Sequence, residues 1–435
     1  MKRSLFILFL LVNSCFAQKK IDHTNNIRQQ VWSITEVLLH DVIDPPAAAR
    51  FYSYSVLTGY EIISQLDTLA PRFIQKLNQF PAIKASFDPS SIDLQLATLY
   101  GILETGKSII PSGYLLEEKQ DQLLNEFKKE KTEQTVIDAS VKLAKEISRQ
   151  IVQYCKTDGY FRLSTLPRYK PLQTDSTWQP TPPAYSAAVQ PQWKTMHTFF
   201  LDSGQQCRAR PPVHFDTSST SAFFKLTKEV YEAVNNLTDE QKLIANFWDC
   251  NPFAVQFQGH MSIGLKKISP GGHWMGITAI ACEKAKLGFT NTMLLHTLVA
   301  LTLNDAFISC WDEKYLTNRI RPETAINRYI DEKWKPILQT PPFPEYSSGH
   351  SVISTASAEI LTYFLGDDFS FVDNTETYIG LPARDFTSFR KAAEEARISR
   401  LYGGIHYRDA IENGGEQGKM IGDLIIKKLS LKPIK

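Results

Sequence analysis

Three short groups of cationic, hydroxyl and imidazole residues in the C-terminal part of the sequence constrain the fold more than any other feature. In chain order they are Lys314 with Arg321, Ser348-Gly349-His350, and Arg400 with His406. One arginine side chain can donate two parallel hydrogen bonds to two oxygens of an oxyanion, and lysine adds a point charge. A fold that brings the three groups to one centre would therefore bind a small tetrahedral oxyanion, with one histidine placed to bond to its central atom.

The local sequence predicts how each group is presented. Lys314 and Arg321 are seven residues apart, so on one helix they would leave the same face about 10 Å apart. Pro322 disfavours helical angles at Arg321, which predicts that the helix ends there. The second group precedes an apolar helical run, and the N–H groups at a helix N-terminus favour an anion. Two glycines in the third group would let the backbone approach closely.

The order Lys-x6-Arg-Pro, Ser-Gly-His and Ser-Arg-x5-His resembles a known superfamily. It joins vanadium-dependent haloperoxidases with type 2 phosphatidic acid phosphatases and bacterial acid phosphatases. A Gly-His-Trp segment ending at Trp274 is also similar to the soluble bacterial haloperoxidases, so the resemblance covers roughly 207–431 and, more weakly, the mature chain. The resemblance implies an all-α fold, a helical bundle of the haloperoxidase and acid phosphatase type.

The resemblance also implies a role for each matching residue. The oxygens of vanadate or phosphate would be held by Lys314, Arg321, Arg400, Ser348 and the Gly349 amide. His406 would be the axial ligand of vanadium or the nucleophile toward phosphorus, and His350 would be the acid–base residue. The family often has proline where this chain has Ser347. The acid expected four residues after the ligand histidine is Ala410 here, so Asp409, one residue earlier, is the candidate to orient His406.

Two chemistries fit such a cage, because phosphoryl transfer and vanadate binding place similar centres among the same cations. Trp311 and Phe343 fall where haloperoxidases place aromatic rings over the peroxide and halide site, although core packing would also explain each ring. Together they favour a vanadate-dependent haloperoxidase that oxidises a halide with hydrogen peroxide. A small organic acceptor is left open. The alternative is a soluble exported acid phosphatase that acts through a phosphohistidine on His406.

The choice of halide follows from the same resemblance. No histidine lies between His350 and His406, so the extra imidazole associated with bromide-oxidising algal enzymes is missing. The layout is most similar to exported bacterial iodoperoxidases, and iodide is the easiest halide to oxidise. We therefore favour iodide or bromide. A member of the superfamily that binds phosphate without catalysis is the non-enzymatic alternative.

The N-terminus has the pattern of a secretory signal. Lys2 and Arg3 precede an apolar run over Leu5 to Val12, and small residues follow up to Ala17. We expect cleavage after Ala17 and export to the periplasm or the medium. Cys15 lies in a loose lipoprotein box, so lipid anchoring at this residue is the alternative.

Charge and cysteine content exclude several classes of function. Loss of the signal removes two basic and no acidic residues, so the formal charge of +2 falls to zero. This balance does not indicate a nucleic acid or an anionic membrane as a partner. Five cysteines remain without Cys-x-x-Cys spacing, which excludes a cysteine-type metal site on sequence grounds and argues against a disulfide framework.

Helical periodicity predicts the organisation of the rest of the chain. After the signal (1–17), region 18–165 is expected to be helical, with two helices meeting at Pro45-Pro46 and further helices near 91–103, 115–129 and 135–155. Region 166–215 is dense in proline and aromatic residues. It is expected to be an ordered connection packed at the rim of the site, with a surface linker as the alternative. Region 216–435 would be the catalytic helical bundle.

Within the catalytic region, Thr238 to Gln258 reads as a helix that begins with a capping box. A second helix opens around His273, which would either line the pocket or be a core histidine. The apolar run Asn291–Trp311 is interrupted by polar residues and is best interpreted as a buried helix, so no membrane span is expected in the mature chain.

Overall fold

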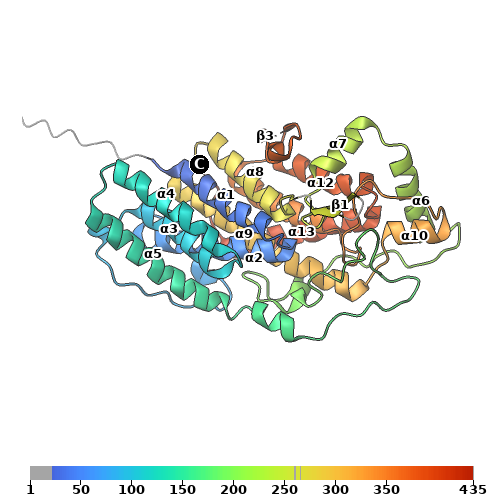
Figure 1. The fold of residues 1–435 in the computed structure, drawn as a ribbon, viewed down its shortest axis with the longest axis horizontal. Helices are drawn as coiled ribbons and strands as arrows, with labels where there is room; N and C mark the ends of the chain where they lie inside the picture. Colours follow the sequence, from blue (N-terminus) through green and yellow to red (C-terminus); the bar gives the residue numbers. More distant parts are fainter. Residues whose placement is uncertain (1–21, 259–260, 265, 435) are drawn as a thin grey trace, which may run out of the picture.

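The computed structural model describes residues 22–258, 261–264 and 266–434. These residues form an elongated helical body with two short antiparallel strand pairs (Figure 1). The prediction of an all-α bundle is confirmed. The predicted signal sequence lies outside the described residues.

The N-terminal region contributes five helices, which lie at the left in Figure 1. They are α1 (Thr24–His40), α2 (Pro45–Leu66), α3 (Leu94–Ile109), α4 (Leu116–Lys129) and α5 (Gln134–Cys155). The predicted break before α2 has a local cause. The carboxylate of Asp44 accepts a hydrogen bond from the N–H of Ala47, and two prolines fill the first helical positions, where no N–H is needed.

The long helix α9 (Phe289–Thr317) is the centre of the fold. It packs against α2, α8 (Pro270–Lys284), α11 (Gly349–Leu365) and α13 (Arg408–Leu429). Its sequence is apolar around most of its circumference, as burial among other helices requires. Among the described residues it is the one helix long and apolar enough to cross a membrane, and that stretch is entirely buried inside the protein. The prediction of a buried helix here is confirmed.

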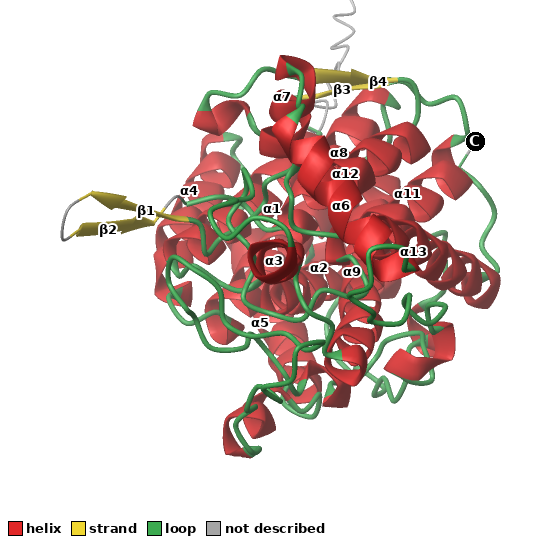
Figure 2. Ribbon diagram, turned by 90° about the vertical axis from the view of Figure 1, so that its right-hand side faces the viewer, coloured by secondary structure: helices red, strands yellow, loops and turns green. Residues whose placement is uncertain are grey.

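The remaining helices are α6 (Ala222–Asn235), α7 (Asp239–Phe247), α10 (Pro322–Tyr329) and α12 (Phe389–Tyr402). The strands are β1 (Val255–Gln258), β2 (Met261–Gly264), β3 (Phe371–Asp373) and β4 (Arg384–Phe386), and the β1–β2 hairpin projects from the helical body in Figure 2. The capping box at Thr238 is present. A helix as far as Gln258 was a wrong prediction, because Pro252 cannot donate to a helix and the chain beyond it pairs as β1.

The proline- and aromatic-rich connection is packed against α9. The buried carboxylate of Asp305 accepts three main-chain hydrogen bonds, of 2.7, 2.7 and 3.0 Å, from Phe199 to Leu201. Trp178 and Trp193 are fully buried. The connection is therefore ordered, as its aromatic content predicts.

Candidate functional site

The three groups of residues meet around one small cavity. Lys314 is in the last turn of α9, Arg321 precedes α10, Ser348 caps α11, Arg400 is in the last turn of α12, and His406 lies between α12 and α13. Arg321 Nη1 lies 3.2 Å from His406 Nε2, and Arg400 Nη1 lies 3.2 Å from His350 Nδ1. Gly349, His350, Arg400 and His406 line a cavity with a volume of about 40 Å³, and Arg321 contacts the lining residue His406.

Lys314 and Arg321 do not share a helix, so that expectation was wrong. Helix α9 ends at Thr317, and Asn318 follows it with left-handed backbone angles (φ 47°). Arg321 is extended, with φ −79° and ψ 151°, because Pro322 disfavours helical angles before it and itself opens α10. The two cations therefore approach the site from successive helices.

The cations of the site are buried and close to one another. Burial, together with a neighbouring arginine in each case, lowers the pKa of Lys314 to about 8 and that of Arg321 to about 10. Burial lowers the pKa of Arg400 as well. Glu345 offsets part of this charge. Cations kept out of water and close together favour the binding of an anion.

Several donors of the two arginines have no partner among the residues that the structure describes. Arg321 donates from Nε to Phe343 O and from Nη1 to Ile405 O, each at 2.9 Å, which leaves Nη2 unpaired. Nε and Nη2 of Arg400 are also buried and unpaired. An unmet buried donor costs about 1–3 kcal/mol. These N–H groups therefore fit the oxygens of a bound oxyanion.

Lys314 differs from the arginines because the main chain uses its ammonium group. Nζ donates to the carbonyl oxygens of Pro344, Glu345 and Ser347, at 3.2, 3.1 and 2.5 Å. Lys314 therefore holds the segment before α11 against α9. In this arrangement it contributes charge to the cavity, and its donors point to the main chain.

Glu345 orients His406. Its Oε1 lies 2.8 Å from His406 Nδ1 and also accepts the N–H of Tyr407 at 3.0 Å, while Oε2 pairs with Arg319 at 3.3 Å. Burial raises the pKa of Glu345 to about 7, and Arg319 opposes that rise. Burial, followed by the charges of the nearby cations, holds the pKa of His406 well below its usual value. His406 is therefore neutral, with a proton on Nδ1 and a lone pair on Nε2 directed at the cations.

Asp409 does not contact His406, and the structure gives it a different role from the predicted one. Its carboxylate pairs with Arg319 at 2.7 Å and accepts the N–H of Val213 at 3.0 Å. One residue turns a helical side chain by about 100°, so the step from position 410 to 409 at the start of α13 points the carboxylate elsewhere. Asp409 acts on the site through Arg319, which binds Glu345.

Ser348 and Gly349 occupy the predicted helix start. Ser348 is the N-cap of α11, where its hydroxyl accepts the N–H of Ser351, and its own N–H donates to Ala410 O at 3.1 Å. The first N–H groups of a helix have no partner within it. A Cβ on Gly349 would lie 3.8 Å from the ring of Trp311, so the amide end of α11 closely faces the aromatic wall of the cavity.

The aromatic rings occupy the predicted places. Trp311 and Phe343 both line the cavity, with ring centroids 5.0 Å apart. The guanidinium carbon of Arg321 lies 5.0 Å from the Phe343 ring, which places the ring against a site cation. The indole N–H of Trp311 donates to Val189 O at 3.2 Å, so the 166–215 connection supports this wall.

His350 is partly exposed and lines the cavity beside Arg400. Burial, then Arg400 and His273, lower its pKa well below the usual value, so it is neutral before an anion binds. His273 is completely buried and is a core histidine, the second of its two predicted placements. The loop Asp249–Phe253 also lines the cavity, and nothing in its sequence marked it as part of the site.

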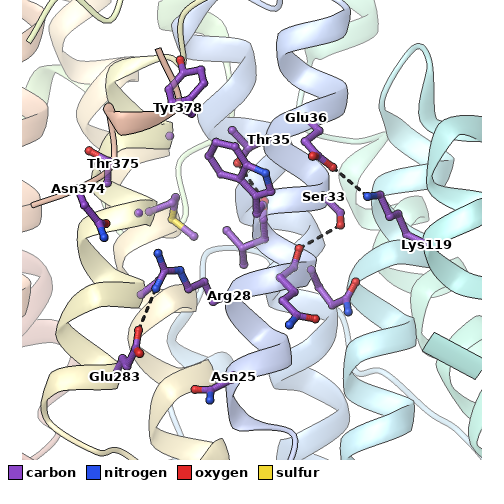
Figure 3. A pocket seen from close by; sticks show the side chains of 18 of the residues that line it. Asn25, Arg28, Ser33, Thr35, Glu36, Lys119, Glu283, Asn374, Thr375 and Tyr378 are labelled. Atoms are coloured by element: carbon purple, nitrogen blue, oxygen red, sulfur yellow. Dashed lines mark hydrogen bonds and ion pairs between the residues drawn. The ribbon is translucent and has the colours of Figure 1, made fainter. Parts of the chain in front are cut away.

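A much larger cavity lies elsewhere in the described chain. It has a volume of about 690 Å³ and is bordered by α1, α4, α8 and the segment after β3 (Figure 3). Its walls carry the ion pairs Arg28–Glu283 and Lys119–Glu36, as Figure 3 shows, and none of the predicted site residues. The predicted site residues therefore lie around the much smaller cavity and not around this one.

Comparisons with known proteins agree with this geometry. The model of the second helical-bundle domain of VCPO matches residues 294–432, a range that contains all three groups of site residues. No curated protein sequence matches the chain. The structure is similar to the crystal structures of a bacterial vanadium-dependent chloroperoxidase in holo and apo forms. Both have 17% identity and a TM-score of 0.68, and the matches cover 89% of this chain and 92% and 94% of those chains.

A solved bacterial vanadium-dependent iodoperoxidase is more similar. It has 40% sequence identity and a TM-score of 0.88, and the match covers 94% of this chain and 98% of that one. Sequence identity of 40% over nearly the full length of both chains shows membership of the same family as well as a shared fold. The chain therefore belongs to the vanadium-dependent haloperoxidase family.

Proposed function

We propose that this enzyme oxidises iodide, and bromide more slowly, with hydrogen peroxide at a vanadate bound in the small cavity. The observation that carries the proposal is the set of unpaired donors on Arg321 and Arg400, together with a neutral His406 whose Nε2 lies 3.2 Å from Arg321 Nη1. Support for iodide comes from the 40% identical iodoperoxidase. When bound, vanadate supplies a Lewis acid that activates peroxide toward a halide.

We assign the roles of the residues from their positions. His406 would ligate vanadium through Nε2, while Arg321 and Arg400 would bind its oxygens and Lys314 would add charge. Ser348 and the Gly349 amide would donate from the start of α11. His350 would hold and transfer the proton that a peroxide oxygen needs. Trp311 and Phe343 would exclude water and border the halide position.

The proposal is tested by triiodide formation. Protein freed of vanadium should be inactive with peroxide and iodide, regain activity with orthovanadate, and turn over bromide more slowly than iodide. Phosphate should compete with vanadate, because the same donors would hold it. A protein that fails to oxidise any halide after loading, yet hydrolyses a phenyl phosphate, would instead be the acid phosphatase alternative.

Substitutions at Glu345 and Asp409 distinguish which acid orients His406. Glu345→Gln replaces the carboxylate that fixes the His406 ring, so orthovanadate should bind about 10- to 100-fold more weakly. Asp409→Asn leaves the contact between Glu345 and His406 in place, so it should weaken orthovanadate binding less than Glu345→Gln does. Titration of both variants with orthovanadate shows which substitution lowers the affinity more, and thermal melts check that both variants fold. A larger loss for Asp409→Asn would mean that the wrong acid has been assigned to His406.

We also propose that the protein is exported, as periplasmic or secreted protein, on the basis of residues 1–17. Anchoring through Cys15 is the alternative form of this proposal.

A further inference from the structure

A second cluster of polar side chains lies buried behind the anion site. Cys250 comes from the loop after α7, His273 from the first turn of α8, and Glu376 from the segment after β3. None of the three is more than 2% exposed. Cys250 also lines the cavity that contains His350 and Arg400, so the two sites share a wall.

The three potential ligand atoms form a compact triangle. Cys250 Sγ lies 3.4 Å from His273 Nδ1 and 3.7 Å from Glu376 Oε1, and Nδ1 lies 3.1 Å from Oε1. Bond lengths of about 2.3 Å to sulfur and 2.0–2.1 Å to nitrogen and oxygen, in tetrahedral geometry, separate such atoms by about 3.3–3.6 Å. The triangle therefore has the dimensions of three ligands around one zinc ion.

The other nitrogen of His273 has the partner that a metal-binding histidine needs. Nε2 lies 2.8 Å from Asp373 Oδ2, and the hydroxyl of Thr375 lies 2.7 Å from the same nitrogen. The ring stacks on Trp248 with centroids 4.5 Å apart and planes at 15°. A carboxylate on one ring nitrogen fixes the tautomer and turns the other nitrogen toward a metal.

Without a metal, the cluster is held by hydrogen bonds: the Cys250 thiol donates to Glu376 Oε1, and His273 Nδ1 lies beside both groups. Nδ1 carries at most one hydrogen, yet it faces both the thiol and the carboxylate. Burial would lower the pKa of His273, but Asp373 and Cys250 raise it well above its usual value. A zinc ion would displace the thiol proton and the Nδ1 proton, so the charge of the cluster would not change.

We propose that Cys250, His273 and Glu376 bind one zinc ion, with water or another small ligand in the fourth position. Zinc has no redox chemistry of its own and can therefore sit beside a site that handles peroxide. It would tie the loop that lines the anion cavity to α8 and to the end of β3. This site runs against the expectation from cysteine spacing that a cysteine-type metal site is excluded, because it needs only one thiolate among ligands from three segments.

Metal analysis of the full-length protein, purified after growth with added zinc, tests the site. Wild type and Cys282→Ser should hold about one zinc per chain, and Cys250→Ser should hold almost none. Cys282 is a matched control because it is also a free, buried thiol and lies on the same helix as His273. Wild-type protein without zinc, or equal zinc in both variants, would overturn the proposal.

A second measurement does not depend on the folding of a variant. Cobalt added to metal-free wild type should produce a thiolate charge-transfer band and release two protons per ion bound. Asp373→Asn should weaken zinc binding about 10- to 100-fold, because it removes the partner of Nε2. Cobalt uptake without the thiolate band would show that the ion binds elsewhere and would sink the assignment.

Discussion

Replacing His406 with alanine should abolish tight vanadate binding and, with it, halide oxidation. The imidazole is the group whose Nε2 lone pair faces the buried cations, and Glu345 holds its proton on the opposite nitrogen. Arginines and lysine attract an anion through charge and hydrogen bonds, but they supply no bond to the metal. The variant should therefore retain at most the weak binding that any oxyanion shows at such a cage.

Titration with orthovanadate, followed by an assay of triiodide formation, measures the effect. His296→Ala is the matched control, since His296 is also buried and neutral, with its pKa lowered to about 4 by burial, and it bonds to Thr292 on α9 outside the site. Glu345 keeps Tyr407 and Arg319 as partners in His406→Ala, so the fold should hold. Unchanged vanadate affinity in that variant would remove His406 as the ligand.

Local sequence predicted those parts of the site that depend on local structure. Ser348 caps α11 because a hydroxyl before an apolar helical run satisfies the first N–H groups. The prolines before α2 and α10 mark helix starts for a similar reason. The resemblance to the family predicted which cations and histidines come together. The aromatic pair Trp311 and Phe343 also lies where that resemblance placed it.

The missed features depend on contacts between distant segments. Glu345 reaches His406 across 61 positions, and no periodicity in the sequence connects them. Asp409 looked suitable because it stands near His406 in the chain, but its helical position turns it toward Arg319. The cluster of Cys250, His273 and Glu376 likewise joins three elements that only the fold brings together.

His350→Ala should keep vanadate but lower the turnover number by about 10²- to 10⁴-fold, the usual contribution of a general acid–base residue. The cations and His406 remain, so affinity for orthovanadate should change only a few-fold. His197→Ala is the control, because His197 is also partly buried and its pKa is also lowered by burial, yet it stands outside the cavity.

The charge state of His350 supplies an independent readout. Before an anion binds, burial, Arg400 and His273 keep its pKa well below the usual value, so the ring is neutral at pH 7. A negative charge placed beside it favours the protonated form and raises that pKa. Vanadate binding should therefore take up one more proton in wild type than in His350→Ala, measured in weakly buffered solution. Equal proton uptake, or undiminished turnover in the variant, would contradict the role of His350 as the residue that holds the proton for peroxide.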